Sequence, residues 1–174
     1  GLILNGRLFE GNESKGAELG HMVIEAGGEP CNCGRRGCIE AYASATALIR
    51  ETKKAMRAHP DSAMWKFSPD IEAVDGRTSF ECAKAGDAAA AEGGDKYLYY
   101  LSEAMLNFCN IFRPQVIILG GGVCAQGQYL TDRLTAIMEK EHYGYSGAPK
   151  VAIAIATLGN DAGLIGAASL IMAG

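Results

Sequence analysis

The chain has 174 residues, 48% of them hydrophobic, and a formal net charge of −4 at pH 7. This length allows one buried core and predicts one domain, and the negative charge with scattered basic residues argues against a nucleic-acid-binding surface, because phosphate contacts need clustered lysine and arginine. No apolar run approaches the ~20 residues that cross a bilayer and nothing resembles a signal peptide. We therefore expect a cytoplasmic protein with no membrane partner, whose six cysteines are metal ligands and buried thiols.

The chain begins with two short apolar runs on either side of Asn5-Gly6. Asn-Gly is the strongest short signal for a β-hairpin, so we expect strands over residues 2–4 and 7–10. A polar loop, a helical turn over residues 18–21 and a brief strand over residues 22–26 are expected to follow.

The next stretch, residues 18–40, reads ELGHMVIEAGGEPCNCGRRGCIE and contains His21, Cys31, Cys33 and Cys38. Cys31 and Cys33 stand too close in the sequence to bridge each other comfortably in ordinary disulfide geometry. The two glycines between Cys33 and Cys38 allow sharp turns that bring the last cysteine back to the same point. One imidazole and three thiolates form the closed tetrahedral shell that is typical of a structural zinc ion. The alternative is three buried cysteines beside an unrelated histidine.

Two carboxylates flank this candidate zinc site, Glu18 three residues before His21 and Glu40 two residues after Cys38. A zinc-bound imidazole keeps a proton on its second nitrogen and can donate it to a hydrogen bond. Two carboxylates and that N–H suit a polyhydroxylated ligand, because each sugar hydroxyl donates and accepts at once. The alternatives are that both are solvated surface acids, and that Glu40 serves the first turn of a helix, where a carboxylate is favoured by the helix dipole.

Helical patterns appear in three later stretches. Apolar residues recur every three or four positions over residues 40–58 and 95–112, and each stretch is stopped by a proline shortly afterwards. Between them, an alanine-rich helix is expected over residues 78–92, capped by Thr78 or Ser79.

A candidate anion site follows these helices. A short apolar run over residues 116–119 predicts a fully buried parallel strand, which leads into Gly120, Gly121 and Gly122 and then a helix over residues 128–139. A strand, a glycine turn and a helix N-terminus together suit a phosphate, because bare backbone N–H groups face the ligand. Three glycines without a fuller motif are a weak signal.

The last two expected elements are a buried strand over residues 150–156 and an apolar helix over residues 161–172. Buried strands that alternate with helices indicate an α/β domain.

The motifs ELGH at residues 18–21 and CNCGRRGCIE at residues 31–40 resemble the signature of the ROK family, which contains bacterial sugar kinases and sugar-responsive repressors, and specifically its glucokinase branch. The resemblance covers the whole chain. It implies an actin/hexokinase-type, ribonuclease H-like lobe with a zinc-binding loop. Residues 1–174 would form one domain, the large C-terminal lobe of a ROK kinase without its small N-terminal lobe.

The resemblance also assigns roles to residues of this chain. The zinc ligands would be His21, Cys31, Cys33 and Cys38, and the sugar-binding residues Glu18, His21 and Glu40. The residues that contact ATP would be Gly1, Gly120, Gly121 and Gly122. The ligands implied are glucose or a related hexose and ATP with Mg²⁺, and the family resemblance implies a homo-oligomer.

The catalytic residues implied by the resemblance are not in this chain. In ROK kinases the base is an aspartate of an Asn-Asp pair upstream of the hairpin, and the phosphate loop D-x-G-x-T lies further upstream still. Asn160-Asp161 looks like that pair, but it stands at the head of the last helix, where turn and cap residues are expected. The chain is therefore expected to transfer no phosphoryl group by itself.

Three other functions remain open from the sequence. The parent protein could be a ROK kinase for N-acetylglucosamine, mannose or fructose. It could be a ROK repressor, whose effector domain uses the same sugar and zinc residues without catalysis. The third is a non-enzymatic interaction module stabilised by zinc.

Overall fold

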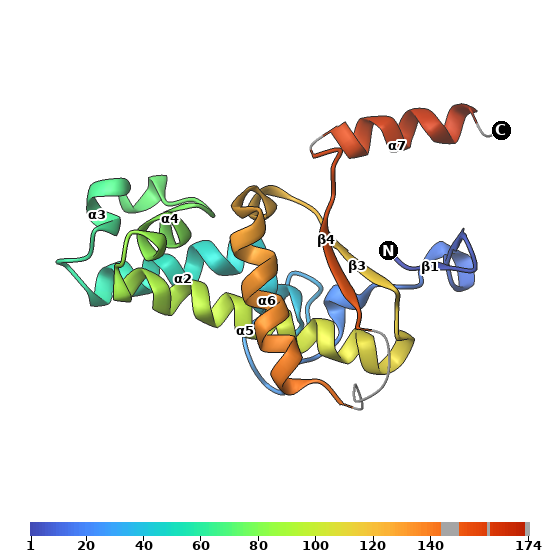
Figure 1. The fold of residues 1–174 in the computed structure, drawn as a ribbon, viewed down its shortest axis with the longest axis horizontal. Coiled ribbons are helices and arrows are strands. Elements are labelled where there is room, and N and C mark those ends of the chain that lie inside the picture. The colour runs from blue at the N-terminus through green and yellow to red at the C-terminus, as the bar shows by residue number, and fades with distance from the viewer. Residues whose placement is uncertain (144–149, 160, 173–174) are drawn as a thin grey trace.

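The structure is a computed structural model that describes residues 1–143, 150–159 and 161–172 (Figure 1). Its helices are α1 (Glu40–Ala43), α2 (Ala45–Ala58), α3 (Met64–Phe67), α4 (Thr78–Lys84), α5 (Ala88–Phe112), α6 (Gln128–Glu141) and α7 (Asp161–Met172). Its strands are β1 (Ile3–Leu4), β2 (Arg7–Leu8), β3 (Val116–Leu119) and β4 (Ala152–Ile155). Short 3₁₀ turns cover residues 12–14, 19–21, 71–73 and 122–126.

The long helix α5 is central to the packing, because α2, α4 and α6 all pack against it (Figure 1). Its apolar stripe is buried, with Leu98 and Met105 at most 1% exposed. Two glycines bring its neighbours close. A Cβ added to Gly94 would lie 3.4 Å from the ring of Phe80 on α4, and one added to Gly93 would lie 3.5 Å from the backbone of α2. The core therefore sits between α5 and the helices around it.

Two expected helices have different limits in the structure. The helix expected over residues 40–58 is broken at Ser44, whose extended backbone ends α1 and whose hydroxyl accepts the Ala47 N–H at 3.1 Å. The helix expected over residues 78–92 ends at Lys84, and residues 88–92 belong to α5. Asp87 begins that helix by accepting the Ala90 N–H at 3.0 Å. In both places a short polar side chain caps a new helix more favourably than it continues the old one.

The predicted cap of α4 was also wrong. Thr78 and Ser79 lie inside the helix and are fully buried. Asp75 precedes the helix, and its carboxylate accepts the Arg77 N–H at 2.8 Å while its own N–H donates to the Thr78 hydroxyl at 3.2 Å. Ser79 is therefore a core position and does not start the helix.

The N-terminal hairpin is confirmed, with shorter strands than expected. β1 and β2 are antiparallel, with Ile3 opposite Leu8 and Leu4 opposite Arg7. Asn5 and Gly6 both have positive φ, as a two-residue hairpin turn requires. The strand expected over residues 22–26 is reduced to one isolated bridge, between Val23 and Cys38.

β3 and β4 are parallel and are connected through α6, which confirms the expected α/β class. Ile117 and Ile153 pack on the core, whereas Val116 and Ile118 on the other face are 42% and 62% exposed. The expectation of a fully buried strand was therefore wrong for the described part of the chain, because helices cover only one face of this sheet.

The last helix, α7, leaves the body of the molecule after β4 (Figure 1). Its assigned side chains are all exposed, including the apolar Leu164 and Ile171 at 76% and 85%. Within the described residues, no helix combines the length and the apolar character needed to span a membrane.

Candidate metal centre

The candidate metal centre is built on a loop that runs from His21 to Glu40. At its base the Ile39 N–H donates to the Met22 carbonyl at 2.9 Å, and further along the Gly37 N–H donates to the Glu29 carbonyl at 2.8 Å. Gly37 has a φ of 80°, and a Cβ there would lie 1.8 Å from the Glu25 carbonyl oxygen. Only glycine fits this crossing, which lets the two arms of the loop lie against each other.

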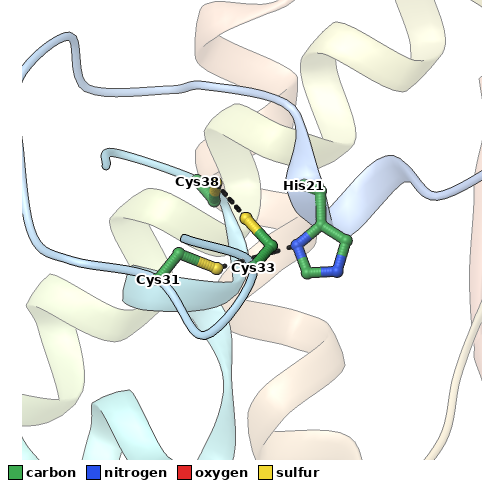
Figure 2. A group of neighbouring side chains, drawn as sticks. All are labelled: His21, Cys31, Cys33 and Cys38. Atoms are coloured by element: carbon green, nitrogen blue, oxygen red, sulfur yellow. Dashed lines mark hydrogen bonds between the residues drawn. The ribbon is translucent and has the colours of Figure 1, made fainter. Parts of the chain in front are cut away.

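The loop brings the four predicted ligands together, as Figure 2 shows. A ring nitrogen of His21 and the Sγ atoms of Cys31, Cys33 and Cys38 all lie within 4.8 Å of one another. Nδ1 of His21 is 3.7 Å from Sγ of Cys31, and Sγ of Cys33 is 3.6 Å from Sγ of Cys38. The cysteines come from both arms of the loop, and the histidine from the 3₁₀ turn (Leu19–His21) that precedes it.

These distances fit a tetrahedral cation. Zinc–sulfur bonds of about 2.3 Å place two sulfurs of a tetrahedron about 3.8 Å apart, close to the 3.6 Å between Cys33 and Cys38. A disulfide would need about 2.05 Å, and all the cysteines of the chain are free thiols. The donor set of one imidazole and three sulfurs suits zinc in a closed structural site. The identity of the ion stays a prediction.

The electrostatics of the cluster favour a cation. Burial, together with the neighbouring Cys33 and Cys31 sulfurs, raises the pKa of Cys38 to about 11, because a nearby thiolate opposes a second negative charge. A hydrogen bond to the backbone of Arg35 lowers the pKa of Cys33. A cation at this point would replace the proton on the buried thiol.

The two predicted sugar carboxylates differ in placement. Glu40 begins α1 and is half-buried, and its Oε1 lies 4.0 Å from Sγ of Cys31. The backbone of Gly20 also lies against it, since a Cβ added there would be 3.8 Å from Cβ of Glu40. Glu18 is exposed and is held at the site through its backbone, where its carbonyl accepts the His21 N–H at 3.0 Å. The structure therefore brings Glu40 to the metal loop and leaves the Glu18 side chain in solvent beside it.

The glycine turn lies at the carboxyl ends of the two parallel strands. Residues 120–122 line a cavity of about 390 Å³ with Ile155 and Thr157 at the end of β4. On the other side they line a cavity of about 310 Å³ with Ser44, at the junction that follows α1. The carboxyl ends of parallel strands are the usual ligand edge of such sheets.

The helix expected over residues 128–139 is confirmed as α6, Gln128–Glu141, but it does not follow the glycine turn directly. The turn continues into the 3₁₀ turn Gly122–Gln126, and α6 begins only at Gln128, after Gly127. Gly1, the fourth glycine predicted to contact ATP, is exposed at the start of the hairpin, where a Cβ would lie 3.8 Å from Leu8. Its contact with ATP stays a prediction.

One residue at the loop was not anticipated from the sequence. Tyr42 on α1 is 7% exposed and accepts the Glu29 N–H at 2.6 Å. The only signal in the sequence was its place on the same short helix as Glu40. Nothing local indicates that its hydroxyl reaches a residue thirteen positions earlier.

Comparisons with known proteins place the chain in a family. The sequence profile of the ROK family matches residues 1–173. A glucokinase from Thermotoga maritima is 36% identical over 172 residues, which are 98% of this chain and 54% of the relative. The crystal structure of a ROK family glucokinase from Streptomyces griseus, in complex with glucose and AMPPNP, matches with a TM-score of 0.88 at 30% identity over 97% of this chain and 55% of that one. The actin/hexokinase-like fold expected from the sequence is thereby confirmed.

A relative of another kind also matches. The xylose repressor of Bacillus subtilis is 26% identical over 174 residues, which are 99% of this chain and 41% of the repressor. The chain spans about half the length of these glucokinases and less than half the length of the repressor.

Proposed function

This chain belongs to the ROK family, and from that premise we propose that it is the larger lobe of an ATP-dependent glucokinase, which transfers a phosphoryl group from ATP to glucose and yields glucose 6-phosphate. The observation that carries the proposal is the placement of the four candidate zinc ligands around one point, with the Glu40 carboxylate beside them. Such a site holds a carboxylate and an imidazole in fixed positions at the surface of the lobe.

The proposed sugar site uses the outer side of this cluster. Nδ1 of His21 faces the sulfurs, so Nε2 is left to carry a proton and donate it to a sugar hydroxyl (Figure 2). The Glu40 carboxylate accepts a hydrogen bond from a sugar hydroxyl at the same place, and the exposed Glu18 can approach the ligand from the preceding turn. A bound zinc ion supplies no reactive group here; its part is to fix the loop that carries these side chains.

The proposed nucleotide site is the glycine turn, Gly120, Gly121 and Gly122, with Gly1 as a further contact. The cavities on its two sides are of a size for a small ligand, and one of them reaches the junction after α1. Side-chain-free backbone lets phosphate oxygens approach the N–H groups, and Mg²⁺ would neutralise the phosphates when ATP is bound.

We assign no catalytic base to this chain. Proton abstraction needs a carboxylate about 2.6–3.2 Å from the attacking hydroxyl. In the proposed enzyme this carboxylate belongs to an aspartate between the two lobes, upstream of the hairpin. Asp161 starts α7 with an exposed side chain and has no place in the proposal, while Asn160 lies outside the described residues. The 174-residue chain alone is expected to be inactive.

The lobe assignment draws support from exposed apolar side chains, which gather on the hairpin, β3 and α7. They are Ile3, Leu4, Leu8, Phe9, Val116, Ile118, Leu164, Ile165 and Ile171. Apolar surface of this extent is normally covered by another polypeptide. We propose that the second lobe covers it in the whole enzyme and that the isolated chain self-associates, which light scattering at increasing concentration measures.

The sugar site is tested by calorimetry with glucose on the zinc-loaded chain. Glu40→Gln is expected to weaken binding about tenfold or more, because a charged acceptor is lost, while zinc stays bound. Glu141→Gln, a change of an exposed glutamate at the end of α6, serves as the control. Equal glucose affinity of Glu40→Gln and the unchanged chain contradicts the site.

The missing base is tested by a glucose phosphorylation assay with ATP and Mg²⁺. The 174-residue chain is expected to give no product above background. Product formation by this chain would mean that its own residues include the base. Competition of N-acetylglucosamine, mannose and fructose against glucose in the calorimetric experiment decides among the hexoses.

The second candidate function is the effector domain of a sugar-responsive repressor, favoured by the match to the xylose repressor. It would bind the sugar through the same residues and transfer nothing. The gene sequence upstream of Gly1 separates the two, because a repressor carries a DNA-binding helix-turn-helix there and a kinase carries its phosphate loop and catalytic aspartate.

A further inference from the structure

The metal loop is fastened to the helical body by two stacked tyrosines. Tyr42 of α1 and Tyr100 of α5 have ring centroids 4.3 Å apart with an interplanar angle of 29°. The Tyr42 hydroxyl accepts the Glu29 N–H at 2.6 Å, and the Tyr100 hydroxyl donates to Oε2 of Glu25 at 3.3 Å. Both contacts end on the arm of the loop that leads to Cys31.

The Tyr42 contact lies at the centre of the loop. The peptide groups of Glu29 are held on both sides, because its N–H donates to Tyr42 while its carbonyl accepts the Gly37 N–H at 2.8 Å. Gly28 leaves the space for the hydroxyl, since a Cβ there would lie 1.9 Å from it. Glu29 stands two residues before Cys31 and Gly37 one residue before Cys38. One hydroxyl therefore fixes the backbone that positions two of the candidate ligands.

The same short helix connects this contact to the proposed sugar site. Glu40 and Tyr42 are two residues apart on α1 and so point to different sides of it. Glu40 lies against Cys31 and Gly20, and Tyr42 lies against Glu29 and Tyr100. The loop thus closes around α1, with the carboxylate on one side and the tyrosine on the other.

We infer that Tyr42, backed by Tyr100, is a positioning residue that holds the metal loop closed before a cation binds, so that its hydroxyl sets how tightly the cation is held. The expected effect on cation binding rests on the proposed metal site, whereas the closed loop itself rests on the contacts of Tyr42 and Tyr100 described above. A loop that is closed in advance loses less conformational freedom when the ligands gather, and the cation binds more tightly for that reason.

The test compares Tyr42→Phe, Tyr100→Phe and the control Tyr99→Phe, whose ring is 54% exposed. Tyr42→Phe keeps the stacked ring and removes only the hydroxyl. Zinc affinity is measured by competition with a chromophoric chelator, and Co²⁺ titration reports the ligand set through its absorption bands. We expect Tyr42→Phe to lower the affinity for both zinc and Co²⁺ about tenfold. The absorption spectrum of the Co²⁺-saturated protein should not change. Tyr100→Phe is expected to have a smaller effect, and Tyr99→Phe none.

A second measurement needs no metal. Hydrogen exchange of the Glu29 amide is followed by NMR in the metal-free chain, where we expect protection in the unchanged protein and its loss in Tyr42→Phe. Unchanged zinc affinity in Tyr42→Phe, or equal exchange of the Glu29 amide in both proteins, overturns the inference. If the unchanged chain binds no zinc, the proposed metal site is what fails, and the Glu29 amide still decides whether the tyrosine holds the loop.

Discussion

The metal loop and the helical body of this chain are stabilised in different ways. The body buries Leu48, Phe80 and Leu98 at 1% exposure or less, and its helices enclose two clusters of buried apolar side chains. The loop buries little apolar surface and relies on backbone hydrogen bonds, the Tyr42 hydroxyl and four gathered ligand atoms. The body should therefore fold without a cation, whereas a cation should add stability to the loop that the Tyr42 hydroxyl already holds closed.

The body also contains a buried charge that the loop lacks. Glu51 on α2 is 8% exposed, and its carboxylate contacts Lys96 at 2.7 Å, Arg50 at 2.9 Å and Lys54 at 3.0 Å. Burial by itself raises the pKa of Glu51, but the three cations outweigh it and bring the pKa from 4.5 down to about 2. Lys54 also reaches Glu29 at 3.4 Å, so this cluster touches the loop from the body.

The largest expected effect is on the body. Phe80→Ala removes a ring that is 1% exposed and should lower the free energy of unfolding by about 3–5 kcal/mol. Urea denaturation of the metal-free chain, followed by circular dichroism, measures it. Phe80→Leu is the control and should cost clearly less, because it leaves a smaller cavity. A loss of stability that appears only in the zinc-loaded protein would contradict the division between body and loop.

The next effect separates the loop from the body. Cys38→Ala removes a fully buried candidate ligand. It should lower zinc affinity by more than about 100-fold, because even the loss of a hydrogen-bond partner of a metal ligand lowers affinity by about 10- to 100-fold. Cys82→Ala makes the same change at a buried cysteine of α4 and should leave zinc affinity unchanged. Metal analysis after dialysis and chelator competition give both values. Tight zinc binding by Cys38→Ala would remove this cysteine from the site.

The smallest expected effect is the pH-dependent contribution of Glu51 to the stability of the body. Because the folded-state pKa of Glu51 is lowered, its contribution is present above about pH 4.5 and is lost as the pH falls towards 2. Glu51→Gln should cost about 1–2 kcal/mol at pH 7, since the partner lysines are half exposed and solvent screens them. The difference from the unchanged chain should shrink below pH 4.5 in urea denaturation. A difference that is constant from pH 7 to pH 3 would show that charge is not its cause.

Much of this protein followed from its sequence because it depends on spacing along the chain. Asn5-Gly6 predicts the hairpin turn, the apolar run at 116–119 predicts a strand, and the spacing of the histidine and three cysteines predicts the cluster that the structure brings together. Ser44 and Asp87 are residue types that often cap helices. The alanine-rich helical pattern around them nevertheless predicted continuous helices, so the breaks were missed.

Only the tertiary structure decided which surfaces meet. Whether Ile118 is buried depends on what covers the second face of its sheet, and no residue near it in the sequence carries that information. The contact of Tyr42 with Tyr100 joins residues 58 positions apart and requires α1 to lie against α5. Local motifs are set by short-range geometry that the chain carries with it, whereas packing partners are chosen by the burial of surfaces that come together only when the whole domain folds.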